Sequence, residues 1–315
     1  MGLTASLAAV SLGEGSTPLV AAGRLSAATG FDLHLKCDGV NPTGSFKDRG
    51  MVVAVGRAAE SGARAVVCAS TGNTAASAAA YAARAGLPAI VLTPAGAIAT
   101  AKRAQALAAG AQLLEVRGTF DDALRLCREL GARPGYVLVN SINPDRIEGQ
   151  KSVVFEILEQ LGTVPEIIAL PFGGGGNVTA VAAGLHEAGV SCRIVVGEAA
   201  ERATTWASAI RIAEPAHAAH VAELVASGRV EVVTLSEDEI RAAWRRLAME
   251  EGVFCEPASA AGFAALLRSG AGSGSKQPIV CILTGHGLKD PGALEAADEG
   301  TVVEATLDAV LEAVG

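Results

Sequence analysis

The sequence predicts an α/β protein whose parallel strands are covered by helices on both faces. From about residue 62, short runs rich in valine and isoleucine alternate with longer runs rich in alanine. The short runs are apolar at nearly every position, which is typical of strands buried on both faces of a parallel sheet. The chain of 315 residues is long enough for one large or two medium domains.

Strands and helices alternate in order along the chain. ARAVVCA at 63–69 is expected to be a buried strand, and the alanine-rich residues 73–84 a helix, because alanine is the strongest helix former. Apolar runs predict further strands at 88–93, 112–116, 135–140, 166–171, 193–198, 230–235 and 278–284. Helical patterns follow at 99–109, 121–130, 147–161 and from Val178. Residues 202–230 show no clear strand, and GSGSK at 272–276 is a surface turn.

Composition excludes several classes of protein. Half of the residues are hydrophobic and 18% are charged, so the chain can bury a core and is not disordered. The net charge of −8 argues against a nucleic-acid partner. No apolar stretch approaches the ~20 residues of a membrane-spanning helix. The first 15 residues lack a basic segment followed by an apolar one, and no two of the six cysteines lie within four residues of each other. We therefore expect a cytoplasmic protein with reduced thiols.

Four loops that follow predicted strands, or open predicted helices, carry the polar chemistry. In open parallel sheets, ligands bind where loops leave the carboxyl ends of strands. The four loops are Asn41–Gly50, Ser70–Thr74, Gly173–Asn177 and Thr284–Gly287.

The glycine loop is the clearest anion site. Gly173, Gly174, Gly175 and Gly176 expose backbone N–H groups without Cβ atoms, and Asn177 follows them into a helix whose N-terminus favours negative charge. No lysine follows, so the loop is not a nucleotide P-loop. A phosphate is the expected ligand, and a plain flexible turn is the alternative.

Lys47 lies in the segment NPTGSFKDRG, where Ser45 is a plausible N-cap. A lysine in the first turn of a helix faces the positive end of the helix dipole, which lowers the pKa of its amine. A catalytic amine and a solvated lysine paired with Asp48 or a later glutamate are both compatible with this pattern.

The other two loops are less specific. The loop STGNTAAS can bind a carboxylate, or it can simply begin a helix. In TGHG, Thr284 presents a hydroxyl at a strand end, and His286 is either a general base or a structural group in a glycine turn. The five histidines show no metal-ligand spacing, so no metal is expected.

Taken together, these segments resemble the fold-type II pyridoxal-phosphate enzymes and, among them, the threonine synthase family. The resemblance covers residues 13 to 291 and includes EGSTPL, SINPDRIEGQK, SAIRIAEP, EPASAA and TGHGLKDP. It implies two open, twisted, mostly parallel sheets flanked by helices, as in the tryptophan synthase β fold. It also implies a smaller domain at 42–140, a larger one at 1–41 and 141–315, and a homodimer.

The resemblance also implies roles for individual residues. Lys47 would form a Schiff base with pyridoxal 5′-phosphate, and Phe46 would pack beside its ring. Asn73 would bind the 3′-oxygen, Gly173 to Asn177 the phosphate, and Thr284 the pyridine nitrogen. The residues implied for the substrate carboxylate are Ser70, Thr71 and Thr74. Those implied for the substrate phosphate are Lys102, Asn140, Ser141 and Arg146.

This sequence departs from the family pattern at three places. The glycine loop reads GGGGN, which leaves the phosphate to backbone N–H groups without a side-chain amide. Asp145 replaces a common aromatic residue and is expected to weaken the hold of Arg146 on an anion. Ala213 and Glu214 stand where Gly-Asn is usual.

The implied activity is the conversion of O-phospho-L-homoserine and water to L-threonine and phosphate. Three alternatives remain: a threonine or serine dehydratase, a non-catalytic relative, and an enzyme that accepts another phosphorylated amino acid.

Overall fold

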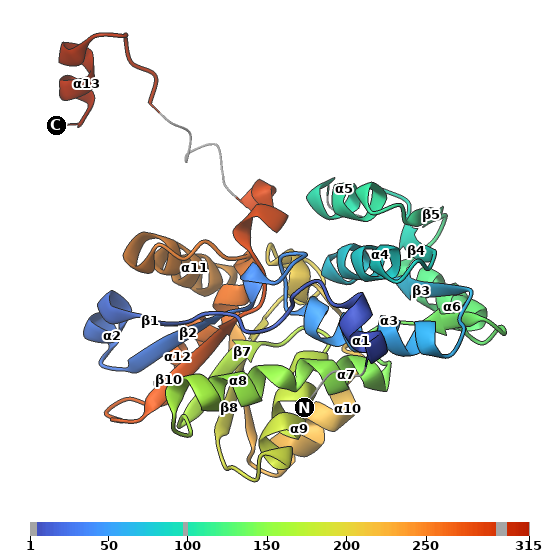
Figure 1. The fold of residues 1–315 in the computed structure, drawn as a ribbon. Helices are drawn as coiled ribbons and strands as arrows, with labels where there is room; N and C mark the ends of the chain where they lie inside the picture. Colours follow the sequence, from blue (N-terminus) through green and yellow to red (C-terminus); the bar gives the residue numbers. More distant parts are fainter. Residues whose placement is uncertain (1–4, 97–99, 294–300, 315) are drawn as a thin grey trace.

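The computed structural model describes residues 5–96, 100–293 and 301–314. Two sheets organise the chain (Figure 1). The larger has the strand order β1-β2-β10-β7-β8-β9, and all of its neighbouring strands are parallel except β1 and β2. The smaller is wholly parallel, with the order β5-β4-β3-β6. The predicted fold class is therefore confirmed.

The larger sheet takes its strands from both sides of the smaller one in sequence. Its strands are β1 (Leu19–Ala21), β2 (Asp32–Cys37), β7 (Ile167–Pro171), β8 (Arg193–Ala199), β9 (Val230–Leu235) and β10 (Pro278–Leu283). Helices α2 (Gly23–Thr29), α11 (Glu237–Glu251) and α12 (Ala261–Ser269) bury one face. Helices α8 (Ser152–Leu161), α9 (Gly176–Glu187) and α10 (Ala218–Ala226) bury the other. The first two strands had not been predicted.

The smaller sheet consists of β3 (Ala65–Ala69), β4 (Ala89–Pro94), β5 (Gln112–Val116) and β6 (Tyr136–Leu138). Its principal core packs α3 (Lys47–Glu60), α4 (Asn73–Arg84) and α5 (Thr100–Ala108) on one face. Helix α6 (Phe120–Gly131) covers the other face. The helix predicted at 99–109 corresponds to α5, and its first predicted residue, 99, lies outside the described residues. The domain boundaries at 42 and 140 stay a prediction.

The single helix predicted at 147–161 is wrong. Two helices occupy this region, α7 (Pro144–Gln150) and α8, and Lys151 separates them. A Cβ at Gly149 would lie only 2.0 Å from the Arg49 carbonyl oxygen, so α7 lies backbone to backbone on α3. Helix α7 packs against α3 while α8 packs on the larger sheet, which accounts for the change of direction.

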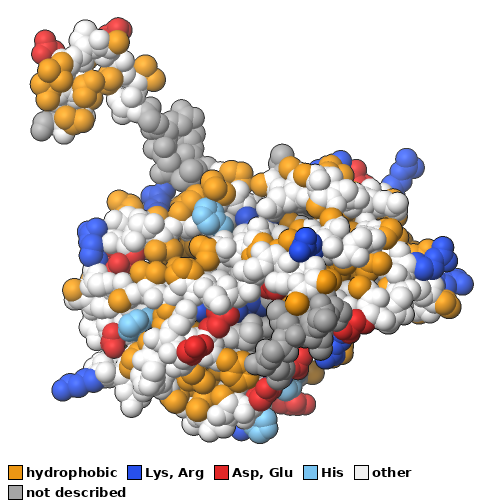
Figure 2. Space-filling model, in the orientation of Figure 1, with side chains coloured by type: hydrophobic (Ala, Val, Ile, Leu, Met, Phe, Trp, Pro, Cys, Tyr) orange, Lys and Arg blue, Asp and Glu red, His pale blue; other side chains and the backbone are white. Residues whose placement is uncertain are grey.

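The chain ends in α13 (Leu307–Val314), which buries none of its residues. Its apolar side chains are exposed beside its acidic ones (Figure 2). In the described part of the chain, no helix is long and apolar enough to cross a membrane. The segment in which no signal peptide was expected begins at Met1, and residues 1–4 lie outside the described part.

Candidate active site

Three of the four predicted loops follow the carboxyl ends of strands directly, after β3, β7 and β10. The loop that leads to Lys47 follows β2 through a short 3-10 helix, η1 (Asp38–Val40). Strand β10 lies between β2 and β7 in the larger sheet, which brings the last residues of these strands to one edge.

Lys47 is the first residue of α3. The Ser45 N-cap is wrong, because no side chain caps this helix and the Ser45 hydroxyl is buried without a partner. Asp48 holds the turn instead. Its buried carboxylate accepts bonds from the N–H and the hydroxyl of Thr43, at 2.7 and 2.6 Å, and from the Ser77 hydroxyl at 2.6 Å. The carboxylate therefore has partners of its own, and the solvated Lys47–Asp48 pair is not formed.

The Lys47 amine is held without a counter-ion. Its Nζ lies 4.4 Å from the centroid of the Phe46 ring, and no ion pair or hydrogen bond of Nζ occurs among the described residues. Burial, and then the charge of Arg146, lower the pKa of Lys47 to about 7, while Glu256 acts in the opposite direction. An amine with this pKa is partly neutral near pH 7, as a nucleophile or proton acceptor must be.

Thr284 lies beside the start of α3. The Phe46 N–H donates to the Thr284 carbonyl oxygen at 2.9 Å, which ties the lysine loop to the end of β10. The Thr284 side chain is buried, and its hydroxyl lies 3.1 Å from the hydroxyl of Ser259. Two of the predicted loops thus meet directly.

His286 has a structural role in its turn. Its Nδ1 accepts a bond from the Leu288 N–H at 3.1 Å, and its ring packs edge-on against Phe254. The imidazole thereby caps the short helix η4 (Gly287–Lys289), which favours the structural interpretation over a general base.

Asn73 begins α4 and points to a group that had no predicted role. Its Nδ2 donates to Oε2 of Glu256 at 2.7 Å, and its Oδ1 is buried without a partner. The other oxygen of Glu256, Oε1, lies 2.8 Å from the ammonium of Lys102. Both side chains of this ion pair are nearly inaccessible. Glu256 thus brings Lys102 and Asn73 together, and the charge of Lys102 is already balanced.

The serine-threonine loop is only partly free. The Ser70 hydroxyl accepts bonds from the N–H groups of Gly72 and Ala75, at 3.0 and 3.3 Å, and so holds the loop in shape. Thr71 and Thr74 are half-buried at the beginning of the helix. Asn140 is buried, and its side-chain amide forms two hydrogen bonds with the backbone of Ala69. Its Oδ1 accepts from the Ala69 N–H and its Nδ2 donates to the Ala69 carbonyl oxygen, both at 2.9 Å. It joins the ends of β3 and β6.

The glycine loop opens α9, and Gly175, with φ of 85°, is its N-cap. A Cβ at Gly175 would lie 2.9 Å from the Cβ of His217, so the loop could not carry side chains here. The backbone N–H of His217 donates to the Gly174 carbonyl oxygen at 3.1 Å. The ring Nε2 of His217 lies 3.0 Å from the Ser141 carbonyl oxygen. His217 therefore holds the predicted residue Ser141 beside the loop.

Two polar side chains lie beside this loop, in addition to the backbone N–H groups that were expected to serve it alone. The side-chain Nδ2 of Asn177 and the Thr179 hydroxyl are both buried and lack a partner. They lie in the first turn of α9, directly after the glycines. A side-chain amide and a hydroxyl are thus available next to the backbone N–H groups.

Arg146 is completely buried and forms no ion pair with a described carboxylate. Its guanidinium donates to two carbonyl oxygens, that of Val139 at 2.9 Å and that of Lys47 at 3.5 Å, and its Nε has no partner among the described residues. Asp145, which was expected to weaken the hold of Arg146 on an anion, pairs with Arg57 rather than with Arg146, and its influence stays a prediction.

Glycines set the distance between Lys47 and Arg146. A Cβ at Gly50 would lie 2.4 Å from the Arg146 carbonyl oxygen, and Gly149 approaches Arg49 as closely from the other helix. Helices α3 and α7 therefore touch through their backbones. The lysine and the arginine stand on two helices that cannot be brought closer.

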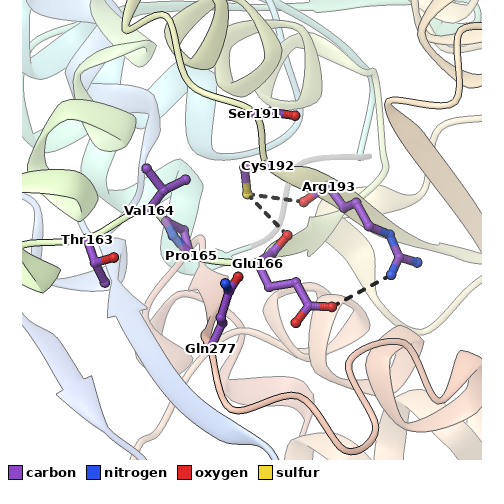
Figure 3. Close-up of a pocket in the computed structure, with 8 residues that line it drawn as sticks. All are labelled: Thr163, Val164, Pro165, Glu166, Ser191, Cys192, Arg193 and Gln277. Atoms are coloured by element: carbon purple, nitrogen blue, oxygen red, sulfur yellow. Dashed lines mark hydrogen bonds and ion pairs between the residues drawn. The ribbon is translucent and has the colours of Figure 1, made fainter.

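Of two hollows in the described part of the chain, the larger lies away from these groups and the smaller adjoins one of the predicted loops. One, of about 400 Å³, is lined by residues at the amino ends of β7, β8 and β10 (Figure 3). It contains the Cys192 thiol, which donates to the carbonyl oxygens of Glu166 and Arg193, and none of the predicted site residues. The other, of about 210 Å³, lies behind Gly285 and His286. The chemistry of the loops, rather than the size of a hollow, marks the site.

Sequence reasoning missed four groups at this site, namely Glu256, Ser259, His217 and Thr179. Glu256 and Ser259 lie in EPASAA, where a glutamate beside small apolar residues signals a buried charge that needs a cation. No comparable signal marks His217, because its contact with the glycine loop depends on how α10 is placed.

Comparisons with known proteins agree with this geometry. The model of the family described as "Pyridoxal-phosphate dependent enzyme" matches residues 10–285. The threonine synthase of Mycobacterium leprae is 47% identical over 97% of this chain and 91% of that protein. The threonine synthase of Halalkalibacterium halodurans is 46% identical over 90% and 85% of the two chains.

Solved structures show the same fold at lower identity. Maize serine racemase superposes with a TM-score of 0.78 at 23% identity, covering 93% of this chain and 92% of its own. Cysteine synthase from Entamoeba histolytica gives a TM-score of 0.80 at 20% identity, with 96% and 93% covered.

Proposed function

Because the chain belongs to the pyridoxal-phosphate dependent enzyme family, and within it to the threonine synthases, we propose that it converts O-phospho-L-homoserine and water to L-threonine and phosphate. The observation that carries the choice of a phosphorylated substrate is Arg146, a buried guanidinium without a carboxylate partner.

The residues of the site fit pyridoxal 5′-phosphate. Gly175 in the glycine loop has no room for a side chain. The Asn177 amide and the Thr179 hydroxyl, which have no partner among the described residues, are suited to the cofactor phosphate. Lys47 supplies an amine of lowered pKa, and Phe46 an aromatic face next to it. Asn73 and Thr284 would hold the 3′-oxygen and the pyridine nitrogen. The bound cofactor supplies an electron sink for a carbanion at the substrate Cα.

Lys47 would move the protons of the reaction. Its Nζ, freed when the substrate binds, takes the proton from Cα and later returns one. The neutral form required for the first step is accessible near pH 7 because burial and Arg146 lower the pKa of Lys47. Lys47 lies at the start of α3, beside Thr284 and at the edge where the loops meet.

Arg146 and Lys102 would hold the substrate phosphate. A guanidinium that makes only carbonyl contacts inside the protein gains most from a charged acceptor. Lys102 would contact the phosphate while it keeps its ion pair with Glu256. Ser141 lies near the glycine loop and Asn140 shapes the preceding strand end. We assign the substrate carboxylate to the loop of Ser70, Thr71 and Thr74.

We further propose a cytoplasmic homodimer with a smaller domain at 42–140 and a larger one at 1–41 and 141–315. The four-stranded sheet lies within residues 65–138, which supports this division. A cleft between the two parts would exclude water until the phosphate has left.

One assay tests the proposal. The purified protein with its cofactor is incubated with O-phospho-L-homoserine, and phosphate and threonine are measured. We expect equal amounts of both products. A threonine or serine dehydratase would instead release ammonia and a keto acid from threonine or serine, and this result would replace the proposal.

A further inference from the structure

Glu256 joins the two sheets of the molecule at the candidate site. It precedes the short helix η3 (Pro257–Ala260), which packs on the larger sheet. Its carboxylate contacts Asn73 at the start of α4 and Lys102 on α5, both of which cover the smaller sheet. The side chain is 1% exposed, so these contacts are made out of reach of solvent.

The position of this carboxylate is fixed by backbone. The Glu256 N–H donates to the Gly285 carbonyl oxygen at 2.8 Å. A Cβ on Gly285 would lie only 1.9 Å from Oε2, so the carboxylate rests directly on the glycine. Together with the Lys102 ammonium at 2.8 Å from Oε1, this leaves Oε2 as an acceptor that faces Asn73.

A fixed acceptor determines how the Asn73 amide is turned. The amide has a donor end and an acceptor end of almost the same shape. With the acceptor end toward Glu256, two oxygens would lie 2.7 Å apart and repel each other. Nδ2 therefore faces the carboxylate. One N–H of Nδ2, and the buried Oδ1 that has no partner, remain for a ligand.

We propose that Glu256 is a positioning residue for Asn73. The Glu256 carboxylate determines which end of the Asn73 amide is left to the cofactor. This inference rests on the proposed function, in which Asn73 contacts the cofactor. Lys102 balances the charge of the carboxylate, because an unpaired carboxylate at this depth would be costly.

The test uses the holoenzyme and three variants, E256Q, N73D and the double variant N73D/E256Q. Glutamine has the shape of glutamate but offers either an N–H or an oxygen, so Asn73 is no longer constrained in E256Q. In N73D two carboxylates would meet. In the double variant, the introduced glutamine can donate to the introduced aspartate and restore the contact.

The readouts are the absorption spectrum of the bound cofactor and its dissociation constant after reconstitution. We expect N73D to weaken cofactor binding by about tenfold or more, and N73D/E256Q to recover most of that loss. E256Q alone should shift the absorption maximum. Glu166→Gln, at the opposite end of the larger sheet, is the matched control and should do neither.

Additive losses in the double variant would overturn the inference, because they would show that Glu256 does not act on residue 73. An unchanged absorption maximum in E256Q would overturn it as well, since relief of charge repulsion alone can rescue N73D. Thermal unfolding of each variant identifies losses caused by misfolding, and a variant that does not fold is replaced by N73S with and without E256Q. There the same coupling is expected, at smaller size. If the unmodified protein turns over phosphohomoserine and the losses are additive, only the positioning role fails. If it binds no cofactor at all, both proposals fail.

Discussion

Arg49 and Arg146 are both buried where α3 meets α7, yet their surroundings are opposite. Arg49 pairs with Asp38 at 2.8 Å and with Glu156 at 2.6 Å, and it also donates to two hydroxyls. Arg146 has two carbonyl oxygens and an unpartnered Nε. The protein supplies the Arg49 guanidinium with carboxylate and hydroxyl partners, but it gives the Arg146 guanidinium only carbonyl partners and no counter-ion among the described residues.

The pKa values follow the same division. Burial alone would lower the pKa of Arg49, but Asp38 and Glu156 outweigh it and raise the value. For Arg146 burial prevails and lowers the pKa to about 10. A buried charge that is fully paired stabilises one arrangement of the chain, whereas a buried charge without a counter-ion is a place for a ligand. Four experiments test whether the two arginines differ in this way.

The largest effect is expected from Arg49→Met. It leaves Asp38 and Glu156 buried without their cation, which costs about 3–5 kcal/mol. Urea unfolding of the variant should show this loss in the free energy of unfolding. A loss below about 1 kcal/mol would mean that the network can reorganise around Lys36, which also pairs with Glu156 at 2.8 Å.

Arg146→Ala should instead affect catalysis. A charge-assisted bond to phosphate is worth about 1.5–3 kcal/mol, so kcat/KM for phosphohomoserine should fall roughly 10- to 200-fold. Arg146→Met, which keeps more of the volume, should change the free energy of unfolding by less than about 1 kcal/mol, because the charge that it removes is uncompensated. Steady-state kinetics and urea unfolding measure the two quantities. A change in kcat/KM below about threefold would remove Arg146 from the substrate site.

The third change concerns the titration of Lys47 in the cofactor-free protein. Its pKa of about 7 when folded lies below the usual ~10.4 of the unfolded chain, so between these values the unfolded chain binds the extra proton. The contribution of Lys47 to stability therefore rises with pH through this window and is lost as the pH falls toward 7. Subtracting the pH profile of Lys47→Met isolates it from other groups.

Arg146→Met provides the control for this titration. Without the neighbouring charge, the pKa of Lys47 should rise and the window should narrow from its lower end. A window unchanged by Arg146→Met would show that burial alone sets the pKa of Lys47.

The smallest effect is expected from Arg57→Ala. The Arg57 side chain is 55% exposed and pairs with Asp145 at the surface. Such pairs contribute at most about 1 kcal/mol, and kcat/KM should change by less than about threefold. A larger kinetic effect would mean that Asp145 does act on Arg146.

The sequence was sufficient for the features that depend on local pattern. Apolar runs between alanine-rich helices predicted the strands from 63 onward, and the rule that ligands bind at strand ends pointed to the loop of Thr284. The loop of Lys47 was singled out by the place of the lysine at the start of a predicted helix. Partners that come from distant segments could not be found this way. Asp145 stands next to Arg146 in sequence but pairs with Arg57 on another helix. Lys102 meets Glu256, which lies far along the chain and beyond the whole of the smaller sheet.

Two local expectations failed because tertiary contacts outweighed them. Ser45 has the right chemistry for an N-cap, but Asp48 binds Thr43 and Ser77 and so shapes the turn. Residues 147–161 have a helical pattern throughout, but the approach of Gly149 to α3 redirects the chain near Lys151. Neither effect is visible in a short window of sequence.

The glycine contact between α3 and α7 has a mechanical consequence. An interface of backbone against backbone contains no rotamers that could rearrange, so it resists both compression and sliding. We expect α3 and α7 to move together as one rigid unit. The spacing between the Lys47 amine and the Arg146 guanidinium should therefore vary little in thermal motion. Whatever opening and closing the rest of the molecule undergoes, this part of the site keeps its dimensions.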